Sequence, residues 1–222
     1  MSESGLDTAH DHLEGWSLPA WTYDDPEFAA LEVDRIFRPS WQVVCHVSDV
    51  PNVGDWHSLD YIGESVIVVR GADQILRGFT NVCRHRGSRL VDGSGGCAKK
   101  LVCPYHAWTY SRSGDLTSAP NMADDDNFDA KSHGLMEVCC EVFGGFIWIN
   151  FHPEESVSQW LQPIAQHFQD WQISDLRITH ELVYDVQANW KLIFQNYSEC
   201  YHCPIVHPML NRLTPYQGSS NE

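Results

Sequence analysis

Two short segments of the chain each carry one cysteine followed closely by one histidine. They are Cys83-Arg84-His85 and Cys103-Pro104-Tyr105-His106. Each pair is compact enough to face a single metal site, and two thiolates with two imidazoles are strong ligands for metal ions. One interpretation is a tetrahedral zinc ion. The other is a [2Fe–2S] cluster with Cys83 and Cys103 on one iron and His85 and His106 on the other.

The order of the ligands favours the cluster over zinc. Cysteine comes first in both segments, so two similar loops that face each other would sort sulfur to one iron and nitrogen to the other. Zinc sites usually pair Cys with Cys in one loop and His with His in the next. The flanking sequence is also basic, because five cations are opposed only by Asp92. They are Arg84, Arg86, Arg89, Lys99 and Lys100. Such positive charge favours the arrival of an electron on the cluster.

A second candidate metal site lies near the other end of the chain. At 100° per residue, an apolar stripe that begins at Trp190 leaves Gln195, Glu199 and His202 together on the opposite side of a helix. His202 and His207 do not align on a straight helix, but Pro204 between them predicts a break that brings both rings to one point. Two imidazoles with a carboxylate form the facial triad of non-heme Fe(II) oxygenases.

The triad is incomplete in this sequence, since the only carboxylate after His207 is the final residue, Glu222. Cys200 and Cys203 form a C-x-x-C pattern among these ligands, and we do not expect them to bind a metal.

The first residues contain no apolar stretch, so we expect no signal peptide, a cytoplasmic protein and reduced cysteines.

Composition narrows the class of protein further. The chain has 222 residues, 43% of them hydrophobic, and a net charge of −16. Such an acidic protein repels phosphate backbones, so we expect no nucleic-acid partner. The longest mostly apolar run, Val142 to Phe151, is too short to cross a bilayer, so we expect no membrane association. The acidic residues 1–17 and Asp124–Asp126 are typical of a mobile tail and a solvated loop.

The elements that must position these ligands divide near residue 153. An Asp cap with Pro26 predicts a helix that runs to about Phe37. Between residues 41 and 151 the pattern of short strands predicts a small sandwich or barrel, with hairpins at residues 65–77 and 135–151. Later residues predict a helix over 157–168 kinked at Pro163, a strand over 179–186, and a helix capped by Asn189. We therefore expect a tail and helix (1–40), a β domain (41–153) and the first part of an α+β domain (154–222).

The chain resembles the catalytic (alpha) subunits of Rieske non-heme iron oxygenases, the aromatic-ring-hydroxylating dioxygenase family. The resemblance rests on Cys83-Arg84-His85-Arg86-Gly87 and on Cys103-Pro104-Tyr105-His106-Ala107-Trp108-Thr109-Tyr110. Three further stretches support it, and together the matches cover residues 18–216; they are Leu18–Trp21, Ile36–Trp41 and Val53–Asp55. Ala107 stands where the family usually has glycine, so we expect the same backbone path with slight strain.

The resemblance implies a fold, two cofactors and a role for three residues of the second site. It implies an all-β Rieske [2Fe-2S] domain followed by the beginning of an α+β helix-grip catalytic domain that looks truncated. His202 and His207 would hold a mononuclear Fe(II), with the third ligand further along the chain. Glu199 takes the place of a carboxylate, usually Asp, that links a cluster histidine of a neighbouring subunit to an iron-ligating histidine.

The resemblance also implies an activity. Members of this family are terminal oxygenases that take electrons from a ferredoxin or flavin reductase, activate O2, and hydroxylate or demethylate a small aromatic or quaternary ammonium substrate, as homotrimers. The sequence Glu-Cys-Tyr-His at residues 199–202 is similar to that of the family branch that acts on quaternary ammonium compounds. Two alternatives remain open: a Rieske electron carrier without oxygenase activity, since the third iron ligand is absent, and a zinc-bound structural protein.

Overall fold

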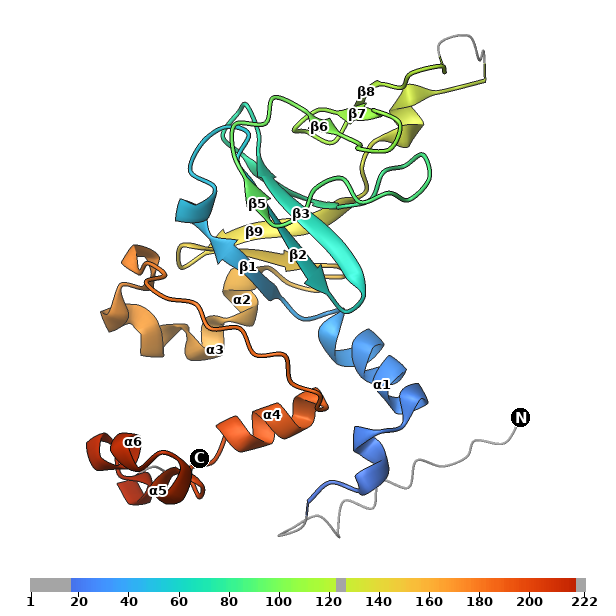
Figure 1. The fold of residues 1–222 in the computed structure, drawn as a ribbon. Coiled ribbons are helices and arrows are strands. Elements are labelled where there is room, and N and C mark those ends of the chain that lie inside the picture. Colours follow the sequence, from blue (N-terminus) through green and yellow to red (C-terminus); the bar gives the residue numbers. More distant parts are fainter. Residues whose placement is uncertain (1–16, 123–126, 219–222) are drawn as a thin grey trace. The chain divides into compact units, whose positions relative to one another are not determined.

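The computed structural model describes residues 17–122 and 127–218 (Figure 1). The chain divides into two compact units, one of residues 32–180 and one that joins residues 1–31 to residues 181–222. The acidic residues 1–16, Asp124–Asp126 and Glu222 lie outside the described residues. Within the described ranges, no helix is both long enough and apolar enough to cross a membrane.

The larger unit is built on antiparallel sheets, which confirms the predicted all-β character. A seven-stranded sheet has the order β1-β10-β9-β4-β3-β2-β5, and a three-stranded sheet has the order β6-β7-β8. The strands are β1 (Gln42–His46), β2 (Trp56–Tyr61), β3 (Glu64–Arg70), β4 (Leu76–Thr80), β5 (Ser94–Gly95), β6 (Leu101–Val102), β7 (Thr109–Tyr110), β8 (Leu116–Ser118), β9 (Glu137–Phe143) and β10 (Phe146–Asn150).

Strand β3 is buried on both faces, which explains its unbroken apolar run from Val66 to Val69. Successive side chains of a strand point to opposite faces. The odd-numbered residues of this run pack with Phe79 in a core that also contains the two metal-site cysteines. The even-numbered residues pack with Ile147 and Ile149 of β10 in a second core. One face of β3 therefore packs in the same core as the cysteines of the candidate metal site.

Both predicted hairpins are confirmed. Strands β3 and β4 pair in antiparallel register, and so do β9 and β10. Gly144 and Gly145 connect the second pair with φ of +60° and +82°. Two consecutive left-handed residues are what a tight primed turn between twisted strands requires.

The helical segments of the larger unit are short. They are η3, a π-helical turn (Val33–Phe37), the 3-10 turns η4 (Val47–Asp49), η5 (Ala130–His133), η6 (Gln166–Trp171) and η7 (Ile173–Asp175), and the helices α2 (Val157–Trp160) and α3 (Gln162–Ala165). The predicted kink near Pro163 is confirmed, because the chain breaks between α2 and α3 at Leu161. The predicted helix from Pro26 to about Phe37 is confirmed, with α1 over Pro26–Glu32 continuing directly as the π-helical turn to Phe37.

The smaller unit contains η2 (Ala20–Tyr23), most of α1, α4 (Trp190–Tyr197), α5 (Cys203–Val206), α6 (Pro208–Leu213) and η8 (Tyr216–Gly218). The predicted cap of α4 is confirmed, since Asn189 Oδ1 accepts the Lys191 N–H at 3.1 Å. The Asn189 amide also donates to the Tyr23 carbonyl at 2.9 Å. The Lys191 ammonium lies 5.3 to 5.6 Å from the ring centres of Tyr23, Phe28 and Trp190. These contacts join the N-terminal segment to α4.

The strand expected over residues 179–186 does not form. Residues 176–187 adopt no regular structure, and the alternating side chains Leu182, Tyr184 and Val186 are all more than half exposed. A strand needs a hydrogen-bonded neighbour, and none of the described strands pairs with this segment. Alternation of apolar and polar residues was therefore insufficient to define a strand here.

Candidate metal centres

The two cysteine–histidine loops have the same backbone conformation. In each loop the cysteine carbonyl accepts a hydrogen bond from the N–H four residues later, at 3.0 Å in both. The N–H of Cys83 and that of Cys103 each donate to the carbonyl five residues later, at 2.8 Å in both. The chain therefore reverses within five residues. This reversal keeps the cysteine and the histidine of each loop close together.

Each loop is closed by a residue in the left-handed region. Gly87 has a φ of +71° and Ala107 has a φ of +58°. The left-handed conformation brings the Cβ of an L-residue close to its own backbone, whereas glycine adopts it freely. The structure thus confirms both expectations for Ala107: the backbone path of the glycine is kept, and the side chain strains it.

The structure brings the four candidate cluster ligands together. Cys83 and Cys103 are 2% and 3% exposed, and their side chains are within hydrogen-bond reach of each other. The rings of His85 and His106 lie farther out, with centres 4.8 Å apart and planes at 72°. Sulfur is therefore on the buried side and imidazole on the solvent side. Among the described residues, no three His, Cys, Asp or Glu side chains are arranged to hold one metal ion.

The local electrostatics suit metal ligation. Burial alone would raise the pKa of the Cys103 thiol, but hydrogen bonds from the N–H groups of Tyr105 and His106 and from Cys83 bring that pKa below its usual value. Desolvation, with repulsion from His106 and Arg86, lowers the pKa of His85. Metals bind thiolate and neutral imidazole. The buried Nδ1 of His85 also lacks a hydrogen-bond partner among the described residues, as an atom facing a cluster would.

Two further residues support this site, and the sequence analysis did not assign them a role. The Tyr110 hydroxyl, fully buried, accepts the Arg84 N–H at 2.9 Å, so its own hydrogen is directed to Cys83 Sγ at 3.3 Å. Burial, together with the Cys83 contact, raises the pKa of Tyr110, which keeps the hydroxyl protonated. Trp108 stacks on the His85 ring at 4.9 Å and 9°. Their aromatic type indicated only a core position.

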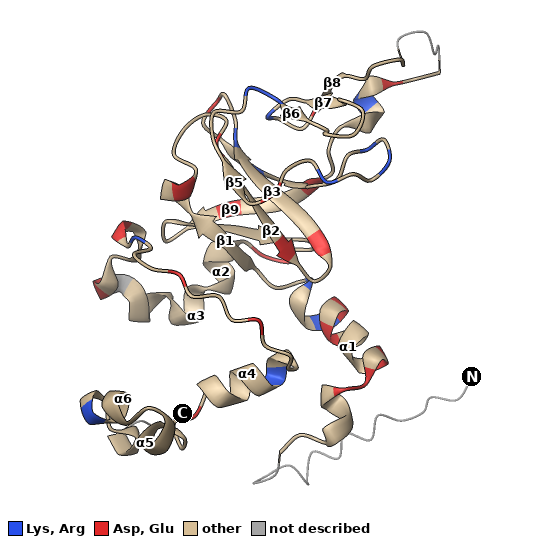
Figure 2. Cartoon of the chain, in the orientation of Figure 1, with Lys and Arg blue, Asp and Glu red and all other residues tan. Residues whose placement is uncertain are grey.

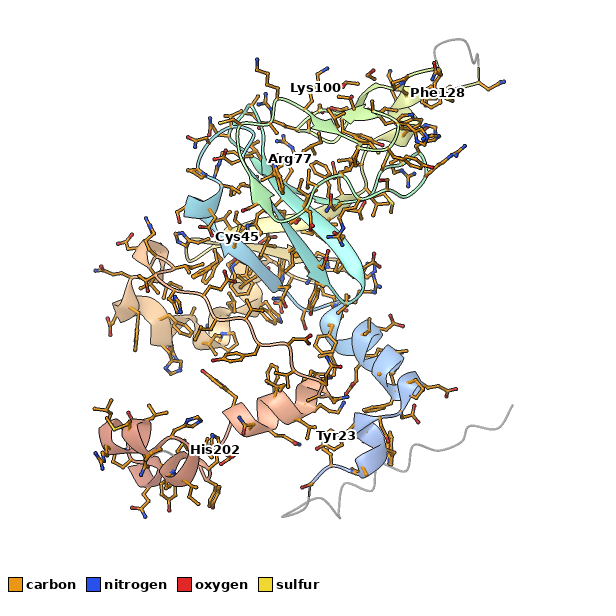
Figure 3. The ribbon with its side chains drawn as sticks, in the orientation of Figure 1. Tyr23, Cys45, Arg77, Lys100, Phe128 and His202 are labelled. Atoms are coloured by element: carbon orange, nitrogen blue, oxygen red, sulfur yellow. A yellow bond between two sulfur atoms is a disulfide. The ribbon has the colours of Figure 1, made fainter. Side chains whose placement is uncertain are left out.

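The second site is formed by a turn between two helices. Helix α4 ends at Tyr197, so Glu199 and His202 lie beyond it. Figure 3 labels His202. Glu199 Oε1 is 2.7 Å from His202 Nδ1, and its other oxygen accepts the Tyr201 N–H. The rings of His202 and His207 have centres 5.3 Å apart. The structure therefore brings Glu199, His202 and His207 together, as predicted.

The predicted route to this arrangement was partly wrong. The helix ends seven residues before Pro204, which instead lies in the first turn of α5. Gln195, expected beside Glu199, is still within α4 and forms hydrogen bonds with the Tyr23 hydroxyl. Helical periodicity does not extend past a helix end, so it placed Gln195 with the wrong neighbours.

The charge state of Glu199 follows from its two donors. Hydrogen bonds from His202 and from the Tyr201 N–H lower the pKa of the Glu199 carboxyl, which remains a carboxylate at neutral pH. A carboxylate bound to Nδ1 fixes the tautomer and orientation of an imidazole, and it leaves Nε2 free to ligate a metal. Glu199 is thus placed to orient His202.

Cys200 and Cys203 form a disulfide, which corrects the expectation that the cysteines stay reduced. The Cys203 N–H donates to the Cys200 carbonyl at 3.0 Å, and this turn holds the two Cα atoms 5.0 Å apart. That separation lies within the usual range for a disulfide. That expectation rested on the cell compartment, which does not reveal such local geometry. The other six cysteines are free.

Comparison with known proteins identifies both parts of the chain. Residues 40–136 match the model of the Rieske [2Fe-2S] domain. Residues 173–221 match the model of the ring hydroxylating alpha subunit (catalytic domain). The first match contains all four candidate cluster ligands, and the second contains Glu199, His202 and His207.

The chain is similar to oxygenase subunits over most of its length. It is 38% identical over 198 residues to the carnitine monooxygenase oxygenase subunit of Escherichia coli (strain K12), which covers 88% of this chain and 53% of that protein. It is 36% identical over 207 residues to the glycine betaine monooxygenase oxygenase subunit of Chromohalobacter salexigens, covering 92% and 46%. A crystal structure of a quaternary ammonium Rieske monooxygenase with L-carnitine superposes with a TM-score of 0.83 at 35% identity, covering 89% and 57%. The chain thus spans about half the length of the curated relatives it matches.

The strain at Ala107 yields a stability prediction. Replacing Ala107 with glycine should raise the free energy of unfolding by about 1 kcal/mol, because relief of left-handed strain exceeds the added entropy of the unfolded chain. Urea unfolding of the apo chain, followed by fluorescence, measures this change. The reverse substitution Gly87→Ala is the matched control: its Cβ would meet no atom within 4 Å, so it should destabilise by φ strain alone. A lower free energy of unfolding for Ala107→Gly than for the wild type would contradict the proposed strain at Ala107.

The Tyr110 hydroxyl yields a prediction for the reduction potential. A hydrogen bond to a ligating sulfur stabilises the more negative, reduced cluster. Loss of roughly 0.5–1.5 kcal/mol in Tyr110→Phe should lower the potential by about 20–60 mV. Redox titration of the cluster absorption measures it. The exposed Tyr105→Phe should leave the potential unchanged, and equal potentials for all three proteins would show that the hydroxyl does not act on the cluster.

Proposed function

This chain belongs to the Rieske non-heme iron oxygenases, and we propose that it is the electron-accepting part of a terminal oxygenase together with the beginning of its iron site. The observation that carries the proposal is the presence of two separate ligand sets, one in each family match. We retain residues 41–153 as the Rieske domain, residues 154–222 as the first part of the catalytic domain, and residues 1–40 as a segment that packs on the latter. The contacts of Tyr23 and Phe28 with Lys191 support this last assignment.

We propose that Cys83 and Cys103 ligate one iron of the cluster and that His85 and His106 ligate the other. The buried thiols, the outward imidazoles and the unpartnered His85 Nδ1 support this assignment. We further propose that His202 and His207 are ligands of the mononuclear iron. The cluster carries one electron at a time, and the iron supplies O2 activation when it is bound and reduced.

We propose that the electron donor, a ferredoxin or flavin reductase, docks beside the cluster histidines. Arg89 is occupied by Asp60 and Asp92, at 2.9 and 3.2 Å. Arg84 and Arg86 are exposed and have no acidic partner among the described residues. Figure 2 shows Lys and Arg segments in the loops beside β6 and β7, in a chain whose net charge is −16. Local positive charge of this kind attracts an acidic donor. The location expected for this exchange is the cytoplasm.

Glu199 is proposed to couple the two redox centres. It holds His202 through Nδ1 and is itself held by the Tyr201 N–H, so both carboxylate oxygens have defined positions. We propose that the oxygenase is a homotrimer in which this carboxylate meets a cluster histidine of the neighbouring subunit. Glu199 then acts as a positioning residue, because it orients the ligand and does not contact the substrate.

We propose a quaternary ammonium compound as the substrate. Relatives that are 34–38% identical over 87–92% of this chain are named for carnitine and glycine betaine. The sequence Glu199-Cys200-Tyr201-His202 resembles that of the quaternary ammonium branch of the family. The reaction would insert one oxygen atom from O2 beside the quaternary nitrogen, and the second would leave as water after delivery of two electrons and two protons.

A substrate panel tests this function. With reduced donor and O2, carnitine or a betaine should stimulate donor consumption several-fold and yield a tertiary amine detectable by mass spectrometry. Carbon isosteres, in which a quaternary carbon replaces the nitrogen, are the matched controls and should stimulate little. Stimulation by aromatic acids alone would overturn the substrate class. A normal cluster spectrum without stimulation of donor consumption by any substrate would favour an electron carrier.

Substitution of Glu199 tests the coupling. Glu199→Ala should leave the cluster spectrum unchanged and slow cluster re-oxidation in a single turnover by about 10–100-fold, the usual effect of removing a residue that orients a metal ligand. Glu199→Gln keeps an acceptor for Nδ1, so its rate of cluster re-oxidation should lie between those of the wild type and Glu199→Ala. The exposed Glu181→Ala is the control and should behave as wild type. Equal re-oxidation rates in all four proteins would refute the bridge.

A further inference from the structure

The Cys200–Cys203 disulfide closes a four-residue ring that contains His202. We propose that this pair is a reversible thiol–disulfide site whose oxidation state controls how firmly His202 is held against Glu199. The inference rests on the proposed function, since it concerns regulation of the same iron site. It adds a redox-active pair that the proposed oxygenase chemistry does not use.

Backbone hydrogen bonds link this ring to both proposed iron ligands. The Val206 N–H donates to the His202 carbonyl at 2.8 Å, and the His207 N–H donates to the Cys203 carbonyl at 2.9 Å. Helix α5 has only four residues, and so short a helix is not stable by itself. The disulfide therefore constrains the turn that carries His202 and the helix that ends at His207. Without the S–S bond both are free to loosen.

The two sulfurs differ in access, which sets their roles in the exchange. Cys200 lines a hollow of about 500 Å3 together with Glu199, Tyr201 and residues 214–217. Cys203 is only 3% exposed. Cys200 is half-buried and lines the hollow, so a small molecule reaches it more readily than it reaches Cys203. Cys200 is therefore the sulfur that reacts with the solvent species, and Cys203 is the resolving partner.

The exchange balances with hydrogen peroxide as oxidant and a dithiol as reductant. In oxidation, the Cys200 thiol loses its proton and the thiolate attacks one peroxide oxygen. The O–O bond breaks, the leaving hydroxide takes up that proton, and a sulfenic acid and one water form. Cys203 then attacks the Cys200 sulfur, the S–S bond forms, and the second water leaves. In reduction, one thiol of the dithiol attacks Cys200 and Cys203 leaves. The second thiol then frees Cys200, and the dithiol becomes a cyclic disulfide. Two electrons move in each direction.

The remaining cysteines provide contrast and controls. Burial raises the pKa of Cys45 and of Cys140 to about 12, so their thiols are unreactive at neutral pH. Cys97 is exposed and free. It has ordinary access to solvent without a partner cysteine in its segment, so it is the matched control for Cys200.

Thiol labelling tests the exchange directly. The folded chain is equilibrated in buffers with varied ratios of reduced to oxidised glutathione, treated with iodoacetamide, and mapped by mass spectrometry. As the ratio of reduced to oxidised glutathione rises, Cys200 and Cys203 should gain label together, with the redox dependence of a two-electron couple. Labelling of Cys97 should not follow that dependence. Two outcomes overturn the proposal: label on both cysteines in every buffer, or a bond that resists excess dithiothreitol while the chain is folded.

Hydrogen exchange tests the structural consequence. Reduction should speed amide exchange over residues 202–207 about fivefold, which corresponds to a loss of about 1 kcal/mol of local stability. Cys200→Ser and Cys203→Ser should give the faster rate in both buffers, and Cys97→Ser should retain the redox dependence. Unchanged exchange on reduction overturns the proposal. Neither measurement needs oxygenase turnover. Both can therefore be interpreted even if the proposed substrate class or the proposed role of Glu199 is wrong.

Discussion

The cluster site depends on one backbone constraint: the chain must reverse within five residues of each cysteine. Both loops meet it with the same two hydrogen bonds and one left-handed residue, Gly87 in one and Ala107 in the other. Without this reversal, the cysteine and histidine of a loop would diverge along an extended chain. The Tyr110 hydroxyl then joins the loops, because it follows the second loop in sequence and bonds to Cys83 of the first. Repetition of one turn thus produces a paired site.

Burial and charge divide this site into two sides with different functions. The cysteines belong to the same core as Phe79 and the odd-numbered side of β3, so the sulfur side is dry and closely packed. The imidazole side carries the exposed Arg84 and Arg86. A low-dielectric interior opposes the added negative charge of a reduced cluster, and positive charge near the surface offsets it. An electron from a donor protein would therefore arrive at the imidazole side.

The features that the sequence predicted correctly are those set by nearby residues. Gly144-Gly145 defines its hairpin and Asn189 caps its helix through contacts within a few positions, so their type and spacing are sufficient. The missing strand at residues 179–186 required a partner strand, which periodicity does not reveal. Gln195 is held by Tyr23, a residue far from it in sequence, and helical periodicity does not reveal such a partner. Tyr110 was missed for a related reason, because a hydroxyl in a core takes its role from three-dimensional neighbours. The Cys200–Cys203 disulfide is local, and it was missed because the cysteines were expected to stay reduced.

The two metal centres are constrained by different means. The cluster loops lie over a core beside a strand buried on both faces, so packing holds their geometry against small changes. The residues of the proposed iron site lie on a turn and beside the four-residue helix α5, where Tyr201 and Ile205 are more than four-fifths exposed. Apart from the buried Cys203, packing contributes little there, and beside the backbone hydrogen bonds of α5 two contacts hold the geometry: the Glu199–His202 hydrogen bond and the bond between Cys200 and Cys203. A site held by a few bonds responds to the loss of any one of them. Regulation at the iron site can therefore act through chemistry on one or two residues, whereas regulation at the cluster would have to disturb a packed core.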